Sequence, residues 1–334
     1  MSLLAAAALA RLGAAPAPAP APVSDPEASS VPYAMPSSYP YNAPTYAITP
    51  TPDGTGSLLH PDVIDFKASH GMDQWNGYRY WMFVTPWYRQ SDPKELPCLL
   101  ASHDAFNWEV PPGVVNPLFR PQAALGDSNY LPDTDMVYDP DTGTLHGYFL
   151  GGRGLYHTST RDGITWTDRQ KLWPRTDEAI PLASPAVVRI ATGAWMMFMG
   201  DGKDAWAYRA PAADGPWEQL RKCKITGLSK MWHLDVIWTG SRFWALIDPD
   251  RGAQVPAVSR DGLTWTAGPS PLALGSGRWD SQWQYRSTLQ PHPEGDKVRV
   301  WYSGHLAEDP TTTTQSWRVG YTHVPASYWT RLGG

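Results

Sequence analysis

The feature that most constrains the fold is a loose repeat of about 50 residues that begins near residue 58. Each repeat holds three short apolar and aromatic runs separated by turn-forming segments, a pattern typical of β-strands joined by hairpins. Strands that recur at this period indicate a β-propeller, in which each repeat forms one blade. The innermost strands are predicted to begin at Asp62, Asp135, Ser184, Asp235 and Arg286, at intervals of 73, 49, 51 and 51 residues. We therefore predict an all-β fold, a five-bladed β-propeller over residues 58–334, with insertions at 90–96 and 114–129 lengthening the first repeat.

A second recurring pattern is a turn signature of the form Ser/Thr-x-Asp-x-x-x-Trp. It occurs at residues 102–108, 160–166 and 259–265, and a shortened form occurs at 214–217. An Asp-Gly pair suits a hairpin because glycine accepts a positive φ and the aspartate carboxylate binds backbone amides beyond it. The tryptophan is then expected to begin the outer strand and to pack between neighbouring sheets. We interpret this signature as structural rather than catalytic.

Residues 1–57 have a different composition and are predicted to form an arm outside the propeller. Residues 1–15 are apolar and alanine-rich, and residues 16–23 read PAPAPAPV. We expect a short helix over residues 2–12, followed by an extended polyproline segment. The arm lacks the positively charged start of a secretion signal, and Arg11 interrupts its apolar stretch. We therefore expect it to be retained and to bind another subunit.

The remaining composition excludes several classes of protein. The net charge is −5 and Lys and Arg form no basic run, which disfavours a nucleic-acid partner. No apolar stretch reaches the ~18 residues that a membrane-spanning helix requires. Cys98 and Cys223 occur without a CxxC or Cys/His pattern, so we predict two buried thiols rather than a disulfide framework or a structural zinc site.

The starts of the inner strands are expected to converge at one mouth of the central channel, where propellers bind ligands. The side chains expected there are His60, Asp62, Asp133, Asp135, Ser184, His233, Asp235, Tyr285 and Arg286. Crowded carboxylates repel one another, so at least one should have a raised pKa. The carboxylates either face a ligand, or they cap strand amides and pair with Arg286. Trp232 and Trp283 adjoin the inner strands and offer flat faces on which sugar rings can stack.

Asp62 in HPDVIDF, Asp135 in PDTDMVYDPDTG and Asp235 in WHLDV resemble motifs of the five-bladed propeller glycoside hydrolases. That clan includes arabinanases, β-xylosidases and invertase-like enzymes, and the resemblance covers roughly residues 58–325. It implies that Asp62 is the general base or nucleophile and that Asp135 tunes the pKa of the acid. The general acid of the clan is a glutamate in the third blade, where this chain has Ser184. A serine cannot protonate a glycosidic oxygen, so the acid would have to be Glu178 or Asp235.

The functional expectation is a propeller that engages a glycan. Our main hypothesis is a phage tail-tip protein that binds host cell-surface glycan through a degenerate hydrolase site. In that setting it would be a virion or extracellular protein whose arm joins other subunits, for example in a homotrimer. The alternatives are an active glycoside hydrolase and, less favoured, a structural docking propeller. The predicted catalytic residues are Asp62, Asp135, Asp235 and Glu178, and the predicted substrate-binding residues are His60, His233, Arg286, Trp232, Trp283 and Tyr285. No cofactor or metal is assigned, although a Ca²⁺ ion in the channel is compatible with the clan.

Overall fold

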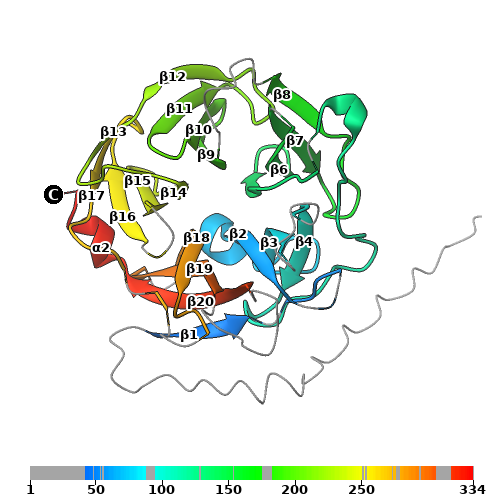
Figure 1. Ribbon diagram of the computed structural model, residues 1–334, viewed down its shortest axis with the longest axis horizontal. Helices are drawn as coiled ribbons and strands as arrows, with labels where there is room; N and C mark the ends of the chain where they lie inside the picture. The colour runs from blue at the N-terminus through cyan, green and yellow to red at the C-terminus, as the bar shows by residue number, and fades with distance from the viewer. Residues whose placement is uncertain are drawn as a thin grey trace, which may run out of the picture. The chain divides into compact units, whose positions relative to one another are not determined.

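The computed structural model describes residues 42–333, apart from 48, 53, 55, 88–94, 128, 153, 175–182, 250, 251, 253, 273, 276–278, 293, 294 and 306–316. Five sheets form a ring in which each sheet radiates from a central channel (Figure 1). The predicted five-bladed all-β propeller is therefore confirmed. The predicted helix over residues 2–12 lies outside the described residues.

The five blades follow one another along the chain. Blade 1 contains β2 (Leu58–Asp65), β3 (Tyr80–Pro86) and β4 (Cys98–Ser102). Blade 2 contains β5 (Asp135–Asp139), β6 (Thr144–Gly151), β7 (Gly154–Thr160) and β8 (Gln170–Pro174). Blade 3 contains β9 (Ala183–Ala191), β10 (Ala194–Gly200), β11 (Ala205–Ala210) and β12 (Glu218–Lys222). Blade 4 contains β14 (His233–Trp238), β15 (Phe243–Asp248), β16 (Val255–Ser259) and β17 (Thr264–Ala267), with β13 (Lys224–Thr226) added at its outer edge.

Blade 5 combines the two ends of the described chain. Its strands are β18 (Trp283–Pro291), β19 (Lys297–His305), β20 (Trp317–Pro325) and β1 (Asn42–Ala47). β1 pairs antiparallel with β20, so an early segment supplies the outermost strand of the last blade. Residues 42–47, which the sequence analysis assigned to the arm, therefore belong to a propeller sheet. This pairing removes an exposed strand edge at β20.

The helical segments are short. They are α1 (Phe66–His70), the 3₁₀ turn η3 (Ala123–Leu125) and α2 (Ser327–Thr330). Within the described residues, none of the helices has the length and apolar character needed to cross a bilayer. Cys98 and Cys223 are both buried and are not joined in a disulfide, as the sequence predicted.

The core is divided among the seams between blades. Trp81 and Phe149 pack in the cluster between blades 1 and 2, and Phe198 and Trp265 pack in the cluster between blades 3 and 4. Trp81 is 1% exposed and Trp265 is 2% exposed. Large aromatic side chains suit these seams because each one buries apolar area from two neighbouring sheets. The high tryptophan content therefore serves packing at these positions.

The turn signature forms the predicted turn, but its tryptophan lies in the outer strand only in the third copy, where Trp265 belongs to β17; Trp108 and Trp166 lie outside the strands. In the third copy, Asp261 Oδ1 accepts hydrogen bonds from the backbone N–H groups of Leu263 and Thr264, both at 2.8 Å. In the second copy, Gly163 has φ +75°, and a Cβ there would lie 2.3 Å from the Trp81 ring. The glycine is therefore required both for its backbone conformation and for the close approach of Trp81 from the preceding blade.

Replacing Asp261 with Ala should lower the free energy of unfolding by about 1–2 kcal/mol, because two turn amides lose their acceptor. Chemical denaturation measures this difference. The matched control is Asp168→Ala, which removes an exposed carboxylate from the outer edge of blade 2. Equal stabilities of the two variants would show that the turn does not depend on this carboxylate.

Candidate functional site

Each blade places one side chain at the same level of the channel mouth. These residues are His60, Asp133, Ser184, His233 and Tyr285, and together we call them the mouth ring. The first three have φ values of 53°, 58° and 49°, although none is glycine. Such left-handed residues cost about 1 kcal/mol or more each and concentrate at functional sites. The repetition of this strained conformation in three blades marks the mouth ring as a candidate site.

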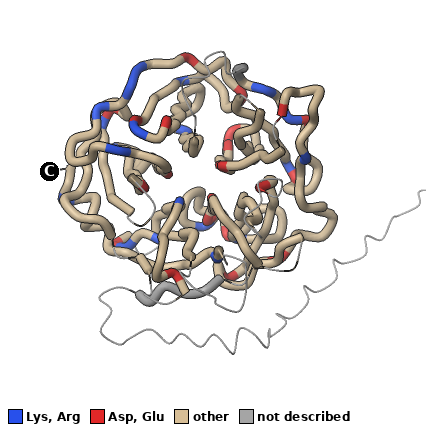
Figure 2. Tube along the Cα trace, in the orientation of Figure 1, with Lys and Arg blue, Asp and Glu red and all other residues tan. Residues whose placement is uncertain are grey.

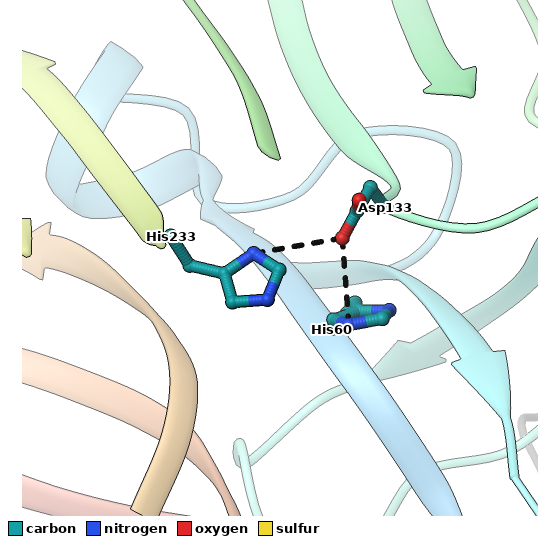
Figure 3. A group of neighbouring side chains, drawn as sticks. All are labelled: His60, Asp133 and His233. Atoms are coloured by element: carbon teal, nitrogen blue, oxygen red, sulfur yellow. Dashed lines mark ion pairs between the residues drawn. The ribbon is translucent and has the colours of Figure 1, made fainter. Parts of the chain in front are cut away.

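Three members of the mouth ring form a compact donor set (Figure 3). Asp133 Oδ1 lies 3.4 Å from His60 Nε2 and 3.6 Å from His233 Nδ1. One donor atom from each residue lies within 4.8 Å of the others, and all three residues are buried. His60 Nε2 and Asp133 Oδ1 have no hydrogen-bond partner among the described residues. Two imidazole nitrogens and a carboxylate oxygen are the ligands that divalent transition metals such as Zn²⁺ prefer, so these residues fit a divalent cation.

His60 is held by a second layer of contacts. Its Nδ1 lies 3.2 Å from Thr85 Oγ1 and 3.3 Å from Glu95 Oε1. Burial lowers the pKa of His60 to about 4, against a partial rise caused by Asp133. The imidazole is therefore neutral near pH 7, which is the form that binds a metal. A carboxylate behind the non-ligating nitrogen is the usual arrangement around a metal-binding histidine.

His233 has a corresponding set of partners. Its Nδ1 contacts Ser184 Oγ, and its Nε2 contacts the hydroxyl of Tyr285. The indole N–H of Trp232 donates to the same hydroxyl at 2.7 Å. The ring of Tyr285 packs edge-on against that of His233, with 4.5 Å between centroids. The imidazole ring of His233 is thus held in place by hydrogen bonds on both nitrogens and by packing against Tyr285.

A layer of three aspartates lies deeper in the channel, and we call it the carboxylate layer. Asp62, Asp135 and Asp235 each accept a hydrogen bond from an inner-strand N–H of the following blade. The donors are Met136 at 2.6 Å, Val187 at 3.0 Å and Leu289 at 2.8 Å. These carboxylates therefore join blade 1 to 2, blade 2 to 3 and blade 4 to 5. Figure 2 likewise shows acidic residues at the inner ends of several blades.

Burial raises the pKa of all three aspartates. The pKa of Asp62 rises to about 7, with added repulsion from Asp235, and the pKa values of Asp135 and Asp235 also rise above their usual range. Arg286 is 1% exposed and lies between the two layers. Its guanidinium is 3.8 Å from Asp133 Oδ1 and 3.8 Å from Asp135 Oδ1. Arg286 thus faces both layers equally, but the three aspartates already accept strand amides whereas Asp133 Oδ1 has no hydrogen-bond partner among the described residues, so the carboxylate layer is the poorer cation site.

The alignment of the blades differs from the sequence prediction at two positions. Ser184, which we aligned with Asp62 and Asp135, lies in the mouth ring. Ala186 is the blade 3 residue in line with the carboxylate layer, as its pairing with Phe198 on the next strand shows. In blade 5 a register shift between Tyr285 and Ser287 moves the equivalent position from Arg286 to Thr288. Neither irregularity has a signature in the local sequence.

The structure brings most of the predicted site residues together. His60, His233 and Tyr285 belong to the mouth ring, and Trp232 and Arg286 contact its members. Glu178 lies outside the described residues. Trp283 stacks on Trp317 at 5.8 Å between centroids, and Trp317 in turn lies 5.5 Å from Tyr285. We call Trp283, Trp317 and Tyr285 the aromatic wall. Sequence reasoning missed Glu95 and Thr85, because nothing local indicates that an insertion and a middle strand would reach His60.

No family model matches the sequence. The chain is 26% identical, over 79% of its length, to a Flavonifractor plautii protein named A type blood N-acetyl-α-D-galactosamine deacetylase, and it spans 44% of that protein. The chain also resembles a crystal structure of an N-acetylgalactosamine deacetylase from F. plautii in complex with blood group B trisaccharide. The two superpose with a TM-score of 0.70 at 21% sequence identity, over 86% of this chain and 96% of that one.

More distant structures share the architecture. The catalytic domain of a GH62 α-L-arabinofuranosidase from Coprinopsis cinerea superposes with a TM-score of 0.58 at 12% identity, over 86% of this chain and 98% of that domain. An α-L-arabinanase from Penicillium chrysogenum superposes with a TM-score of 0.53 at 14% identity, over 82% and 79%. The chain is therefore a five-bladed propeller of the kind found in carbohydrate-active enzymes.

Proposed function

We propose that the protein is a cation-dependent deacetylase that removes the acetyl group from an N-acetylated sugar of a glycan. The observation that carries this proposal is the buried donor set of His60, Asp133 and His233, in which two ligand atoms have no hydrogen-bond partner among the described residues. The similarity in sequence to a protein named as a sugar deacetylase supports the choice of reaction. An active enzyme is thereby favoured over an adhesin with a degenerate site, although the proposed reaction differs from the glycoside hydrolysis that the sequence analysis gave as the alternative.

Each residue of the site would have a separate role in such a hydrolysis. A divalent cation bound to the donor set would polarise the amide carbonyl and acidify a water molecule. His60 and His233 would each contribute an imidazole nitrogen, and Thr85 and Glu95 hold the ring of His60. Glu95, 3.3 Å from His60 Nδ1, lies behind this ligand and orients it, and the proton that the attacking water loses is the one that the sugar nitrogen gains. The water oxygen joins the acyl carbon, the C–N bond breaks, and the sugar nitrogen gains a proton, so the products are acetate and an amino sugar.

A glycoside hydrolase is the second candidate, favoured by the structural likeness to arabinan-cleaving enzymes. Such enzymes need two carboxyl groups on either side of the scissile bond, about 5–5.5 Å apart for retention and about 6.5–9.5 Å for inversion. In the carboxylate layer an oxygen from each aspartate lies within 4.8 Å of the others, and each accepts a strand amide. These aspartates are therefore better suited to joining blades than to flanking a sugar.

The test is an assay of acetate and reducing-sugar release from N-acetylhexosamine-terminated oligosaccharides. The protein is stripped with a chelator and then supplied with Zn²⁺ or Mn²⁺. We expect acetate release that requires the cation and is lost in His60→Ala. Release of reducing sugar that is lost in Asp62→Asn would instead establish a glycosidase.

Glycan binding without release of either product would return the protein to the adhesin hypothesis. Attachment to a phage tail or to partner subunits through the arm concerns residues 1–41, which lie outside the described residues, and stays a prediction. The same holds for a Ca²⁺ ion in the channel.

A further inference from the structure

The hydroxyl of Tyr285 is shared by two neighbouring donors. The indole N–H of Trp232 points to it at 2.7 Å, and His233 Nε2 contacts the same oxygen. An indole N–H can only donate, so Trp232 occupies one of the two acceptor positions on the phenol oxygen. Which way the bond to His233 runs depends on the tautomer of the imidazole.

The proposed cation site determines that tautomer. A neutral imidazole carries one proton, and a nitrogen that ligates a cation cannot hold it. When His233 Nδ1 binds the cation in place of its present contact with Ser184 Oγ, Nε2 must carry the proton and donate it to Tyr285. This step rests on the proposed function, because it requires the cation at the donor set.

The phenol oxygen then accepts two hydrogen bonds, so its own O–H must point to a third partner. Tyr285 is partly exposed, and its ring lies 5.5 Å from that of His60 and 5.5 Å from that of Trp317. Its hydroxyl thus lies beside the proposed cation site, and its ring adjoins the tryptophans of the aromatic wall. A phenol O–H at this place is suited to an oxygen of the glycan rather than to an apolar group.

We propose that Tyr285 positions His233 for the cation and donates a hydrogen bond to a sugar oxygen in the same site. The first role makes it a positioning residue for the cation. The second role makes it a determinant of substrate specificity, since a sugar without an oxygen at that point would leave the donor unpaired.

The experiment uses Tyr285→Phe, which keeps the ring and removes the hydroxyl. Calorimetric titration with Zn²⁺ alone, without sugar, should show an affinity about 10–100-fold weaker than that of the wild type, as is usual when a partner behind a metal-binding histidine is lost. At saturating Zn²⁺, KM for the N-acetylated oligosaccharide should rise about 5–10-fold, which corresponds to one lost hydrogen bond.

Two further variants serve as controls. Tyr148→Phe removes a buried hydroxyl of blade 2 that donates to the Ala213 carbonyl of blade 3 at 2.7 Å. This substitution should change neither the Zn²⁺ affinity nor KM. Trp232→Phe removes a donor to the phenol but leaves the acceptor for His233, so its Zn²⁺ affinity should fall less than that of Tyr285→Phe. Circular dichroism verifies that each variant is folded.

The outcomes separate this inference from the proposed function. Tight Zn²⁺ binding that is unchanged in Tyr285→Phe, with KM also unchanged, would overturn the role of Tyr285 and leave the cation site intact. Absence of Zn²⁺ binding in the wild type, or binding that survives His60→Ala, would overturn the proposed function itself. Weakened Zn²⁺ binding and a raised KM in Tyr285→Phe alone would establish both roles.

Discussion

Replacing Asp133 with Asn is expected to abolish cation-dependent acetate release. The substitution keeps the shape of the side chain but removes the one anion that both imidazoles share, at 3.4 and 3.6 Å. A neutral amide is a weaker ligand for a divalent transition metal than a carboxylate. The loss of Zn²⁺ affinity should therefore exceed the about 10–100-fold typical of an outer partner. Calorimetric titration and an acetate assay measure the two effects.

The matched control for this variant is Asp139→Asn, at the opposite end of the same blade. Asp139 pairs with Arg189 at 3.2 Å and lies away from the mouth ring. Its amide variant should bind Zn²⁺ and release acetate like the wild type. An Asp133→Asn protein that remains as active as this control would place the reaction elsewhere in the molecule.

The second large effect concerns Asp62 and stability. Its Oδ2 accepts the Met136 amide at 2.6 Å and its Oδ1 accepts the Thr288 hydroxyl at 2.9 Å. Asp62→Ala leaves both buried donors without this acceptor, so the free energy of unfolding should fall by about 2–4 kcal/mol. Asp62→Asn keeps an acceptor oxygen and removes a buried charge, and should lower it by less than about 1 kcal/mol. Denaturant titrations compare the two variants.

The same pair of variants has a distinct pH dependence. Because the pKa of Asp62 is raised to about 7 in the folded state, its ionisation weakens the folded protein. Its contribution to stability is fully present below the unfolded pKa near 4 and is lost as the pH rises through 7. Asp62→Asn should therefore lose less stability than the wild type between pH 5 and pH 8. Equal losses would mean that Asp62 does not titrate in this range.

Activity separates the two roles considered for Asp62. If Asp62 only joins the blades, the Asp62→Asn variant should release acetate at a rate within about threefold of the wild type, because the surrounding contacts are preserved. A general base or nucleophile of a glycosidase predicts near-complete loss of sugar release. The resemblance to glycoside hydrolases thus identified the correct fold, whereas the contacts of Asp62 favour a role in joining the blades.

Local sequence was sufficient for the blades. The repeat from residue 58, the alternation of short strands and turns, and the Asp-Gly-x-x-Trp signature depend on neighbours within about ten residues, and all correspond to observed hairpins. The mouth residues His60, His233 and Tyr285 could also be predicted, because the repeat places them at the starts of inner strands. Glu95 could not, since it lies in the predicted insertion at 90–96 and nothing in the local sequence indicates that its carboxylate contacts His60.

The sequence by itself thus determined the number of blades, the turn chemistry and which strand starts face the channel. Only the tertiary structure decided which atoms meet there. Closing the ring brings His60, Asp133 and His233 within reach of one another, although three different blades carry them. The level at which each side chain enters the channel depends on left-handed backbone at Ser184 and a register shift beside Tyr285. Such irregularities are stabilised by contacts across blades, and a shift of one residue changes which side chain faces the ligand.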